Sequence, residues 1–431
     1  MSFSDFALHP TLLRGVADLG FEVPTPIQRA SIPPALEGRD VLACAMTGSG
    51  KTAAFMLPIL QRFLVEKKRA TRALILTPTR ELAAQIEEHT RGLGRYAGIG
   101  VASVIGGVSA GPQEQALRRG VEIIVATPGR LLDHLRNGIA KFDQLEVLVL
   151  DEADRMLDMG FIPDVRRILG YLPKKRQTFF FSATLPAPVV ALSRDMLVSP
   201  VAIDIERPSA PATGITHAVY PIAGEMKSAL LIALLKKAEL QSVLVFTRTK
   251  HRANRLTETL ERQGISCERI HGNRSQAQRT AAMAGFKAGK FRVLVATDIA
   301  ARGIDVTGLS HVVNFDVPNV PDDYIHRVGR TARAEMTGDA ITLVSPDEEG
   351  DLRMIERAIG RRLERSKLEG FDYSKRPAER LEIPLAQRIA TIRARKSDDR
   401  QRARANAARR GGGYGSALAP ARRSSSTRAG V

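Results

Sequence analysis

Residues 41–63 read Val-Leu-Ala-Cys-Ala-Met-Thr-Gly-Ser-Gly-Lys-Thr-Ala-Ala-Phe-Met-Leu-Pro-Ile-Leu-Gln-Arg-Phe. The apolar run Val41–Cys44 leads into a glycine-rich loop, and a helical pattern follows over Ala53–Phe63. Glycines let backbone N–H groups approach phosphate oxygens, and the N-terminus of a helix adds partial positive charge. The segment therefore predicts a nucleotide phosphate site in which Lys51 reaches the β- and γ-phosphates and the Thr52 hydroxyl binds Mg²⁺. Ala45 stands where the strict pattern has glycine.

Short apolar runs typical of buried strands recur along the chain, with helical-looking stretches between them. They lie at Val41–Cys44, Ala73–Thr77, Ile123–Ala126, Val147–Leu150 and Thr178–Phe181, then at Val243–Thr247, Arg292–Ala296, His311–Phe315 and Ile341–Val344. Continuous apolar strands that alternate with helices indicate parallel sheets covered on both faces. A further helix is expected over Arg353–Leu368. The pattern predicts an α/β fold with two sheets.

The break between the two sets of strands contains residues 206–214, Glu-Arg-Pro-Ser-Ala-Pro-Ala-Thr-Gly. Pro, Ser and Gly are typical of linkers. We therefore predict one α/β domain at residues 1–205, a linker at 206–214, a second domain at 215–370 and a tail at 371–431.

The composition narrows the class of protein. The chain has 431 residues, 44% of them apolar, and a net charge of +18. This charge favours a polyanionic partner, with nucleic acid ahead of an anionic membrane surface. Two cysteines are too few for a disulfide framework or a zinc cluster, which weakly favours a reducing, cytoplasmic location. We expect no signal peptide and no membrane span, because the first residues lack the basic-then-apolar pattern and no run of about 18 apolar residues occurs.

Much of the positive charge lies near the end of the chain. Residues 386–431 contain 12 Arg and Lys against 2 Asp, with one aromatic residue, Tyr414, and a glycine run at Gly411–Gly413. Such a segment buries too little apolar surface to offset its chain entropy, so the composition predicts disorder. It is typical either of a solvated extension or of a nonspecific RNA-binding arm, because arginine attracts phosphates and stacks on bases.

An acidic pair follows the apolar run Val147–Leu150. The sequence there reads Asp151-Glu-Ala-Asp154. Carboxylates at the end of an apolar strand lie where α/β sheets bind ligands, so Asp151 is expected to complete the Mg²⁺ site with Thr52. Glu152 is placed to orient and deprotonate an attacking water. The alternative is a capped helix start, since acidic residues also favour the first helical turn.

These motifs, in this order, resemble those of the DEAD-box ATP-dependent RNA helicases, over about residues 3–345. The resemblance implies two RecA-like domains and RNA-stimulated ATP hydrolysis with Mg²⁺. It also implies local, poorly processive unwinding of short RNA duplexes, or remodelling of RNA–protein complexes. RNA is the implied partner, bound through its sugar-phosphate backbone and largely independent of sequence. Ribosomal or ribonucleoprotein partners and a monomeric state are also expected. The basic tail and the lack of a long insertion are similar to the bacterial RhlE-type branch.

The resemblance assigns a nucleotide site and the catalytic residues. Gln28 offers a donor and an acceptor to adenine, and Phe3 is expected to stack on the base, the alternative being a core aromatic. The implied nucleotide-binding set is Phe3, Gln28, Ala45, Met46, Thr47, Gly48, Ser49, Gly50, Lys51, Thr52 and Asp305. The implied catalytic set is Lys51, Asp151, Glu152, Arg330 and Arg333, in which the arginines act as fingers toward the γ-phosphate. Ala332 replaces a family glycine, which favours Arg330 over Arg333.

The resemblance also assigns residues to RNA and to coupling. Arg80 and Arg130 supply charge, while threonine hydroxyls and loop amides supply short donors to phosphate. The implied RNA-binding set is Pro78, Thr79, Arg80, Gly107, Thr127, Gly129, Arg130, Thr247, Arg248 and Thr297, and the coupling set is Asp154, Ser182, Thr184 and His326. Helix caps, turns and surface ion pairs are the structural alternatives for single members of these sets.

Two other classes of protein remain open at this point. One is a DNA-directed translocase built on the same paired domains. The other is an RNA-binding scaffold with a decayed nucleotide site, which the intact Lys51, Asp151, Glu152, Ser182 and Arg330 disfavour.

Overall fold

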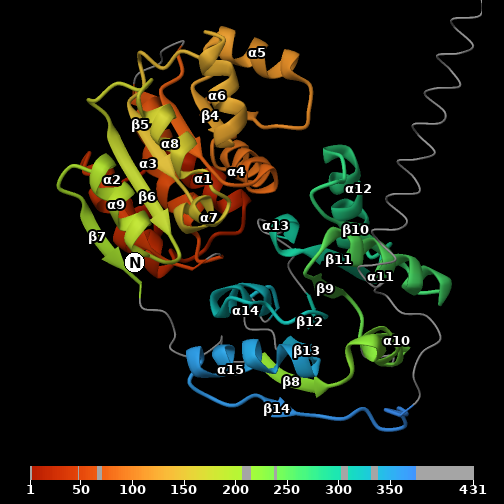
Figure 1. Cartoon of the computed structure of the whole chain (residues 1–431). Coiled ribbons are helices and arrows are strands. Elements are labelled where there is room, and N and C mark those ends of the chain that lie inside the picture. Colours follow the sequence, from red (N-terminus) through yellow and green to blue (C-terminus); the bar gives the residue numbers. More distant parts are fainter. Residues whose placement is uncertain are drawn as a thin grey trace, which may run out of the picture. The chain divides into compact units, whose positions relative to one another are not determined.

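Two parallel β-sheets, each with helices on its faces, form the body of the chain (Figure 1). The structure, a computed structural model, describes residues 2–46, 48–65, 70–205, 215–236, 240–301, 309–331 and 338–374. By its internal contacts the chain divides into a unit of residues 1–376 and a second unit of residues 377–431. In the described ranges no helix is both long and apolar enough to cross a membrane.

The first sheet has seven strands, and all of its pairs are parallel. We call it and its helices the first lobe. Its order is β3 (Val101–Val104), β4 (Ile123–Ala126), β2 (Ala73–Leu76), β5 (Val147–Leu150), β6 (Gln177–Ser182), β1 (Val41–Cys44) and β7 (Val201–Asp204). Because the strands are parallel, the loops that follow β1, β2, β4, β5 and β6 all lie at one edge of the sheet. Those loops carry most of the predicted site residues.

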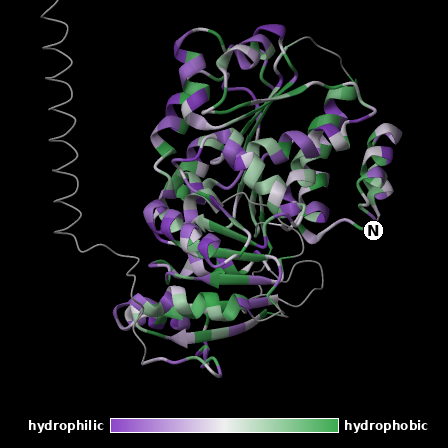
Figure 2. Cartoon of the chain, turned by 90° about the vertical axis from the view of Figure 1, so that its right-hand side faces the viewer, coloured by the Kyte–Doolittle hydropathy of each residue, from purple (hydrophilic) through white to green (hydrophobic). Residues whose placement is uncertain are grey.

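The first sheet is buried on both faces, as its apolar strands require. In β2, Ala73 and Ile75 belong to one hydrophobic cluster and Leu74 and Leu76 to another. Figure 2 shows apolar strands inside and helices with mixed surfaces outside. The helices are η1 (Phe3–Phe6), α1 (Pro10–Asp18), α2 (Pro26–Leu36), α3 (Lys51–Val65), α4 (Arg80–Leu93), α5 (Ala110–Arg119), α6 (Pro128–Arg136), α7 (Ala153–Asp158), α8 (Ile162–Leu169) and α9 (Ala187–Met196).

The second sheet repeats this architecture, and we call it and its helices the second lobe. Its order is β10 (Cys267–Ile270), β11 (Val293–Thr297), β9 (Val243–Thr247), β12 (His311–Asn314), β13 (Gly338–Val344), β8 (Ile215–Pro221) and β14 (Glu364–Arg365). All of its pairs are parallel. Its helices are η2 (Gly224–Met226), α10 (Lys227–Lys236), α11 (Lys250–Arg262), α12 (Gln276–Lys287), α13 (Asp298–Ala301), α14 (Pro321–Val328), η3 (Pro346–Glu348) and α15 (Glu349–Ala358).

Every predicted strand is present, but one predicted helix is wrong in its extent. The helix expected over Arg353–Leu368 is α15, which begins at Glu349 and ends at Ala358. Gly360 follows with φ of 71°, a left-handed conformation that favours glycine and ends helices. The chain then turns back to form β14 beside β8. The predicted domain limits stay predictions, and the linker 206–214 and tail residues 375–431 lie outside the described residues.

Candidate nucleotide and RNA site

The glycine-rich loop after β1 has the backbone that phosphate binding requires. Gly48 and Gly50 have φ of 82° and 93°, which side chains rarely permit. Lys51 begins α3, and its Nζ donates to the carbonyl oxygen of Ala45 at 3.1 Å. The Ser49 hydroxyl donates to the Met46 carbonyl at 2.8 Å. The loop is therefore folded around the Lys51 side chain, while Thr47 lies outside the described residues.

Gln28 joins α2 to this loop. Its Nε2 donates to the Gly50 carbonyl at 3.1 Å, and its Oε1 accepts from the Thr25 backbone at 2.9 Å. A Cβ atom at Gly50 would lie 2.5 Å from Gln28 Nε2, so only glycine permits this approach. The predicted reading of adenine by Gln28 would thus act directly on the phosphate loop.

Phe3 lies in the core of the first lobe rather than on its surface. The side chain is 4% exposed, and its ring stacks on Phe21 at 6.4 Å and meets Phe6 edge-on at 6.1 Å. This is the core-aromatic alternative from the sequence. Stacking on a base stays a prediction, and it would have to use the remaining exposed edge of the ring.

Lys51 and Asp151 face each other between the ends of β1 and β5. Lys51 Nζ lies 3.8 Å from Asp151 Oδ1, and the two side chains are 6% and 3% exposed. Burial raises the pKa of the Asp151 carboxyl to about 6, and the charge of Lys51 opposes this rise. Among the described residues Asp151 Oδ1 accepts no hydrogen bond. Such a buried carboxylate oxygen, together with the hydroxyl of Thr52 in the first turn of α3, fits the oxygen ligands that Mg²⁺ takes.

Glu152 adopts a constrained backbone and meets a buried arginine. Its φ is 55°, in the left-handed region that non-glycine residues seldom occupy. Arg155 Nη1 lies 3.2 Å from Glu152 Oε2, and the two side chains are 2% and 5% exposed. Arg155 was not predicted as a site residue, although its position three residues after Glu152 at a helix start favours a contact between the two side chains.

Asp154 is tied to the segment that follows β6. Its Oδ2 accepts from the Thr184 backbone N–H at 2.8 Å and from the Thr184 hydroxyl at 3.0 Å. The Asp154 backbone N–H donates to the Ser182 hydroxyl at 3.1 Å, which in turn donates to the Thr184 carbonyl at 2.6 Å. The contact predicted between the acidic motif and these hydroxyls is therefore present, while its coupling role stays a prediction.

Two of the predicted RNA-binding segments pack on each other. A Cβ atom at Gly107, whose φ is 76°, would lie 2.0 Å from Arg80 Nη1, so the guanidinium rests against bare backbone. Thr79 caps α4 by accepting from the Leu82 backbone N–H at 3.2 Å and is 5% exposed, and Pro78 is buried. After β4, Thr127 occupies the N-cap position of α6, and Gly129 and Arg130 are partly exposed. Arg80, Gly107, Gly129 and Arg130 thus reach the surface at this edge.

The RNA-binding residues predicted in the second lobe differ in exposure. Thr247 is fully buried, and its hydroxyl faces the carbonyls of Thr249 and Ala296 at 3.5 and 3.4 Å. Thr297 is partly buried. The Arg248 side chain is 43% exposed, and its Nη2 lies 3.4 Å from Glu348 Oε1. An RNA contact through the Thr247 side chain is therefore not accessible in this structure.

His326 lies on α14, and Arg330 lies just after the end of this helix. Arg330 is 7% exposed, and both residues line a small hollow together with Arg155 and Arg327. Arg327 makes a bidentate ion pair with Asp298, in which Nε and Nη2 donate to Oδ1 and Oδ2 at 2.6 and 2.8 Å. Its Nη1 donates to Asn314 Oδ1 at 3.0 Å. Asp305 and Arg333 lie outside the described residues.

A contact that the sequence analysis did not predict joins α4 to α12. Arg279 Nη2 lies 2.9 Å from Glu81 Oε2, and Gln276 Nε2 donates to Glu81 Oε1 at 3.1 Å. Both α12 residues belong to residues 276–279, which read Gln-Ala-Gln-Arg, and Glu81 follows Arg80. No sequence spacing links residues this far apart in the chain.

Comparison with known proteins places these features in a family. Residues 25–192 match the family of DEAD/DEAH box helicases, and residues 226–335 match the helicase conserved C-terminal domain. DEAD-box ATP-dependent RNA helicase CshA of Geobacillus kaustophilus is 40% identical over 382 residues, which are 89% of this chain and 82% of the relative. CshA of Bacillus subtilis is 40% identical over 367 residues, which are 85% and 74% of the two chains.

A solved structure extends the comparison to the fold. S. cerevisiae Dbp5 bound to RNA and ADP BeF3 is similar at a TM-score of 0.77 and 30% identity, covering 85% of this chain and 95% of Dbp5. The fold prediction of two RecA-like domains is thereby confirmed. The relatives named here are CshA proteins, so membership of the RhlE-type branch stays a prediction. Two matched helicase domains, the two parallel sheets and these relatives together show that the chain belongs to the DEAD-box ATP-dependent RNA helicases.

Proposed function

We propose that ATP is hydrolysed at the edge of the first sheet where β1 and β5 end. Backbone N–H groups of residues 45–50 and the Lys51 ammonium hold the phosphates, and Gln28 reads the adenine. Thr52 and Asp151 would hold Mg²⁺, which neutralises charge on the phosphates when bound. Glu152, held in place by Arg155, orients the attacking water and accepts its proton.

The second lobe completes this site in the proposal. Arg330, with Arg333 and Asp305, reaches the nucleotide when the lobes close on ATP and RNA. An arginine finger stabilises the charge of the transferring phosphoryl group and contributes about 10³–10⁵ in rate. Because hydrolytic groups then come from both lobes, turnover depends on closure.

RNA lies across both lobes and is held through its backbone. Arg80, Arg130 and Arg248 supply charge, and the loops around Gly107, Gly129 and Thr297 supply short donors. Support comes from Dbp5, a structural relative that was solved bound to RNA. Closure bends the strand and expels its partner, at about 1.4 kcal/mol per base-pair step if DNA stacking is a guide. Unwinding is therefore local and poorly processive, and we place this activity in a cytoplasmic monomer that acts on RNA–protein complexes.

The observation that carries the proposal is the buried Lys51–Asp151 pair beside Glu152, with Asp154 bonded to Ser182 and Thr184. The test is Glu152→Gln, measured by phosphate release and by RNA binding. We expect turnover to fall by about 10²–10⁴-fold, the usual size of a lost general base, while ATP and RNA still bind. Equal hydrolysis by wild type and variant contradicts the role of Glu152. Stimulation by DNA strands as strong as by RNA strands would favour a DNA-directed translocase instead.

A further inference from the structure

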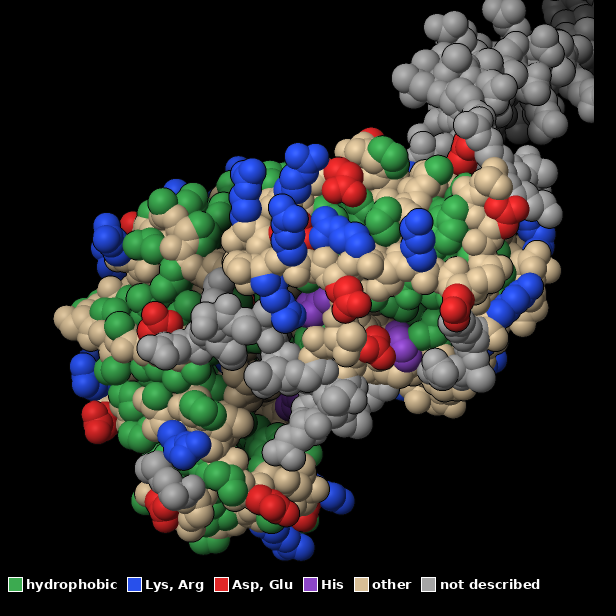
Figure 3. All heavy atoms as spheres, turned by 90° about the horizontal axis from the view of Figure 1, so that it is seen from below, with side chains coloured by type: hydrophobic (Ala, Val, Ile, Leu, Met, Phe, Trp, Pro, Cys, Tyr) green, Lys and Arg blue, Asp and Glu red, His purple; other side chains and the backbone are tan. Residues whose placement is uncertain are grey.

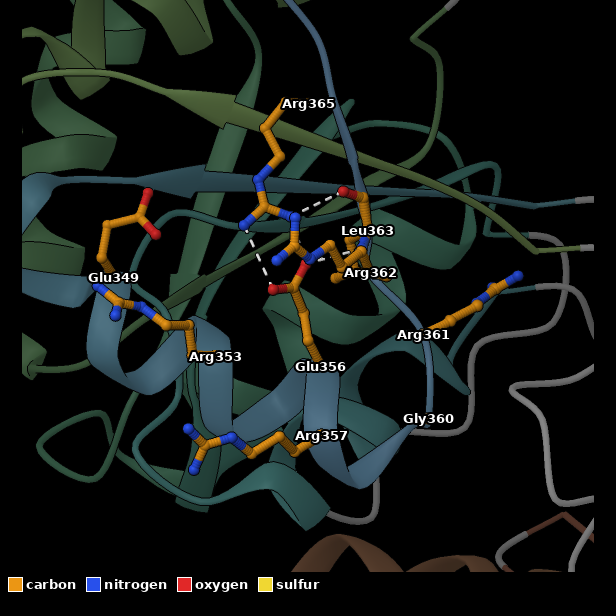
Figure 4. Close-up of a pocket in the computed structure, with 9 residues that line it drawn as sticks. All are labelled: Glu349, Arg353, Glu356, Arg357, Gly360, Arg361, Arg362, Leu363 and Arg365. Carbon is orange, nitrogen blue, oxygen red and sulfur yellow. Dashed lines mark hydrogen bonds and ion pairs between the residues drawn. The ribbon is translucent and has the colours of Figure 1, made fainter.

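A hollow of about 860 Å³ lies on the second lobe at the C-terminal end of α15 and the turn into β14 (Figure 4). This volume is within the range of about 300–1,000 Å³ that is common for ligand sites. Five arginines and two glutamates line it, which gives a net charge of +3. The charged lining residues are Glu349, Arg353, Glu356, Arg357, Arg361, Arg362 and Arg365.

Among the residues that the structure describes, Arg365 is the one arginine of this lining with an ion pair. Glu356, 9% exposed, accepts from the Arg365 guanidinium and from the Leu363 backbone N–H, the latter at 2.7 Å. This pair fixes β14 against α15 and is structural. Within the described ranges, the guanidinium groups of Arg353, Arg357, Arg361 and Arg362 make no hydrogen bond or ion pair. In Figure 4 the Arg361 side chain points away from the others, which leaves Arg353, Arg357 and Arg362.

The hollow lies close to a residue that the proposed RNA path uses. Arg248 Nη2 is 3.8 Å from Asp351 Oδ2, in the first turn of α15. Asp351 lies on α15 between Glu349 and Arg353, and both of these residues line the hollow. Arg353 and Arg357, four residues apart, lie on one exposed side of the helix. Figure 3 shows the molecule from below, and on part of this lower face Lys and Arg side chains lie close together.

We propose that this hollow is a second binding site for RNA phosphates, which holds the strand beyond the proposed path across the two lobes. The inference rests on the proposed function and adds a surface to it. Unpaired guanidinium groups bind phosphate through two parallel hydrogen bonds and carry no sequence preference. The chain's own tail is an unsuitable occupant, because residues 386–431 have a net charge of +10 and would be repelled.

The site has two measurable consequences. RNA that extends beyond the proposed path by about 10 nucleotides binds more tightly than RNA that only covers this path. Each phosphate neutralised on a single strand adds about 0.7 to the slope of log affinity against log salt concentration. The long RNA is therefore also the more sensitive to salt.

The test compares Arg353→Gln/Arg357→Gln with a control of equal charge change in the full-length chain. The control is Arg119→Gln/Arg136→Gln, which changes two exposed arginines in the last turns of α5 and α6. Labelled single-stranded RNAs of the two lengths are titrated with ATP analogue present, at several salt concentrations. We expect the hollow variant to bind the long RNA about 10-fold more weakly at 0.1 M salt, with a slope lower by about 1.4. Its affinity for the short RNA and its ATPase rate with saturating short RNA should match wild type.

The outcomes separate this inference from the proposed function. If the hollow variant and the control bind the long RNA equally, the hollow holds no RNA and the inference is wrong. If wild type binds neither RNA, the proposed function fails first. If the variant loses affinity for both lengths of RNA equally, the arginines act on the proposed path across the lobes and the second site is refuted.

Discussion

Each lobe buries one lysine against one carboxylate, and the two pairs differ in how fully the carboxylate is satisfied. In the first lobe, Lys51 Nζ and Asp151 Oδ1 are 3.8 Å apart, and this oxygen accepts no hydrogen bond among the described residues. In the second lobe, Glu348 accepts from Lys227, from the Ser345 backbone N–H at 3.1 Å and from the Ser345 hydroxyl at 2.8 Å. All four charged side chains are at most 6% exposed.

This difference indicates that the Lys51–Asp151 pair belongs to a functional site and that the Lys227–Glu348 pair stabilises the fold. A buried charge is costly unless paired and hydrogen-bonded, so a fully bonded carboxylate such as Glu348 stabilises its lobe. Burial lowers the pKa of Lys227, and the charge of Glu348 opposes this effect. Asp151 keeps an oxygen without a hydrogen bond inside the protein, and a bound cation would satisfy it. We therefore expect the first pair to matter for turnover and the second for stability.

The largest expected effect is that of Asp151→Asn. The amide has the same shape but no charge, so it is a poor ligand for Mg²⁺ and leaves the phosphates less well neutralised. We expect ATP turnover to fall by about 10³-fold or more, and the free energy of unfolding to change by about 1 kcal/mol or less. Phosphate release and urea unfolding measure the two. A large loss of stability with little loss of turnover would reverse the comparison.

Glu348→Gln should show the opposite pattern. It leaves the Lys227 ammonium, whose side chain is 3% exposed, facing a neutral amide. Removing one partner of a buried pair costs about 3–5 kcal/mol. We expect that loss in urea unfolding, with turnover per folded molecule within a few-fold of wild type at saturating RNA. Unchanged stability would mean that Glu348 is not a scaffold residue.

A smaller and more selective effect is expected at Thr184. Thr184→Ala removes the 3.0 Å hydrogen bond to Asp154 Oδ2 but keeps the backbone bond at 2.8 Å. One hydrogen bond to a charged group contributes about 1.5–3 kcal/mol. If the contact couples hydrolysis to strand separation, unwinding of a short duplex should fall more than ATPase does. Thr184→Ser keeps the hydroxyl and should restore unwinding, and equal losses in both assays would refute coupling.

Much of the fold could be predicted because central strands have a strong signal. The nine predicted strands are apolar runs, buried on both faces by helices. The strands that were missed lie mostly at sheet edges and are more polar, as in Cys267–Ile270, which reads Cys-Glu-Arg-Ile. The helix predicted to Leu368 ends at Ala358, because the left-handed turn at Gly360 overrides helical propensity.

The site was predictable where its residues follow one another in the chain. The phosphate loop and the acidic motif are local patterns, and parallel strands bring them to one edge. The Glu81–Arg279 pair and the burial of Thr247 depend on packing between distant segments. Phe3 shows the same limit, since a ring near the chain start can meet a base or the core, and the structure places it in the core.

The smallest expected effect at neutral pH concerns His217, a buried titratable side chain of the second lobe, and the pH dependence of the free energy of unfolding. Burial, together with the smaller effect of the Arg361 charge, lowers the pKa of His217 to about 4. His217 Nδ1 lies 2.9 Å from the Tyr324 hydroxyl, while Nε2 has no partner among the described residues. The folded lobe therefore holds the neutral imidazole.

The sign of the pH dependence follows from this depressed pKa. Above the unfolded pKa of about 6.5 the imidazole is neutral in both states, and stability is unaffected. As the pH falls from there toward 4, the unfolded state gains the proton first, and stability is lost. At about pH 5 we expect a loss of about 2 kcal/mol in wild type that His217→Gln does not show. Urea unfolding at about pH 7.5 and pH 5 measures it, and the comparison cancels other titrating groups such as Asp151. If variant and wild type lose the same free energy of unfolding between the two pH values, His217 is not held as a buried neutral imidazole. The interior of the second lobe would then not have the structural role that the Lys227–Glu348 pair suggests.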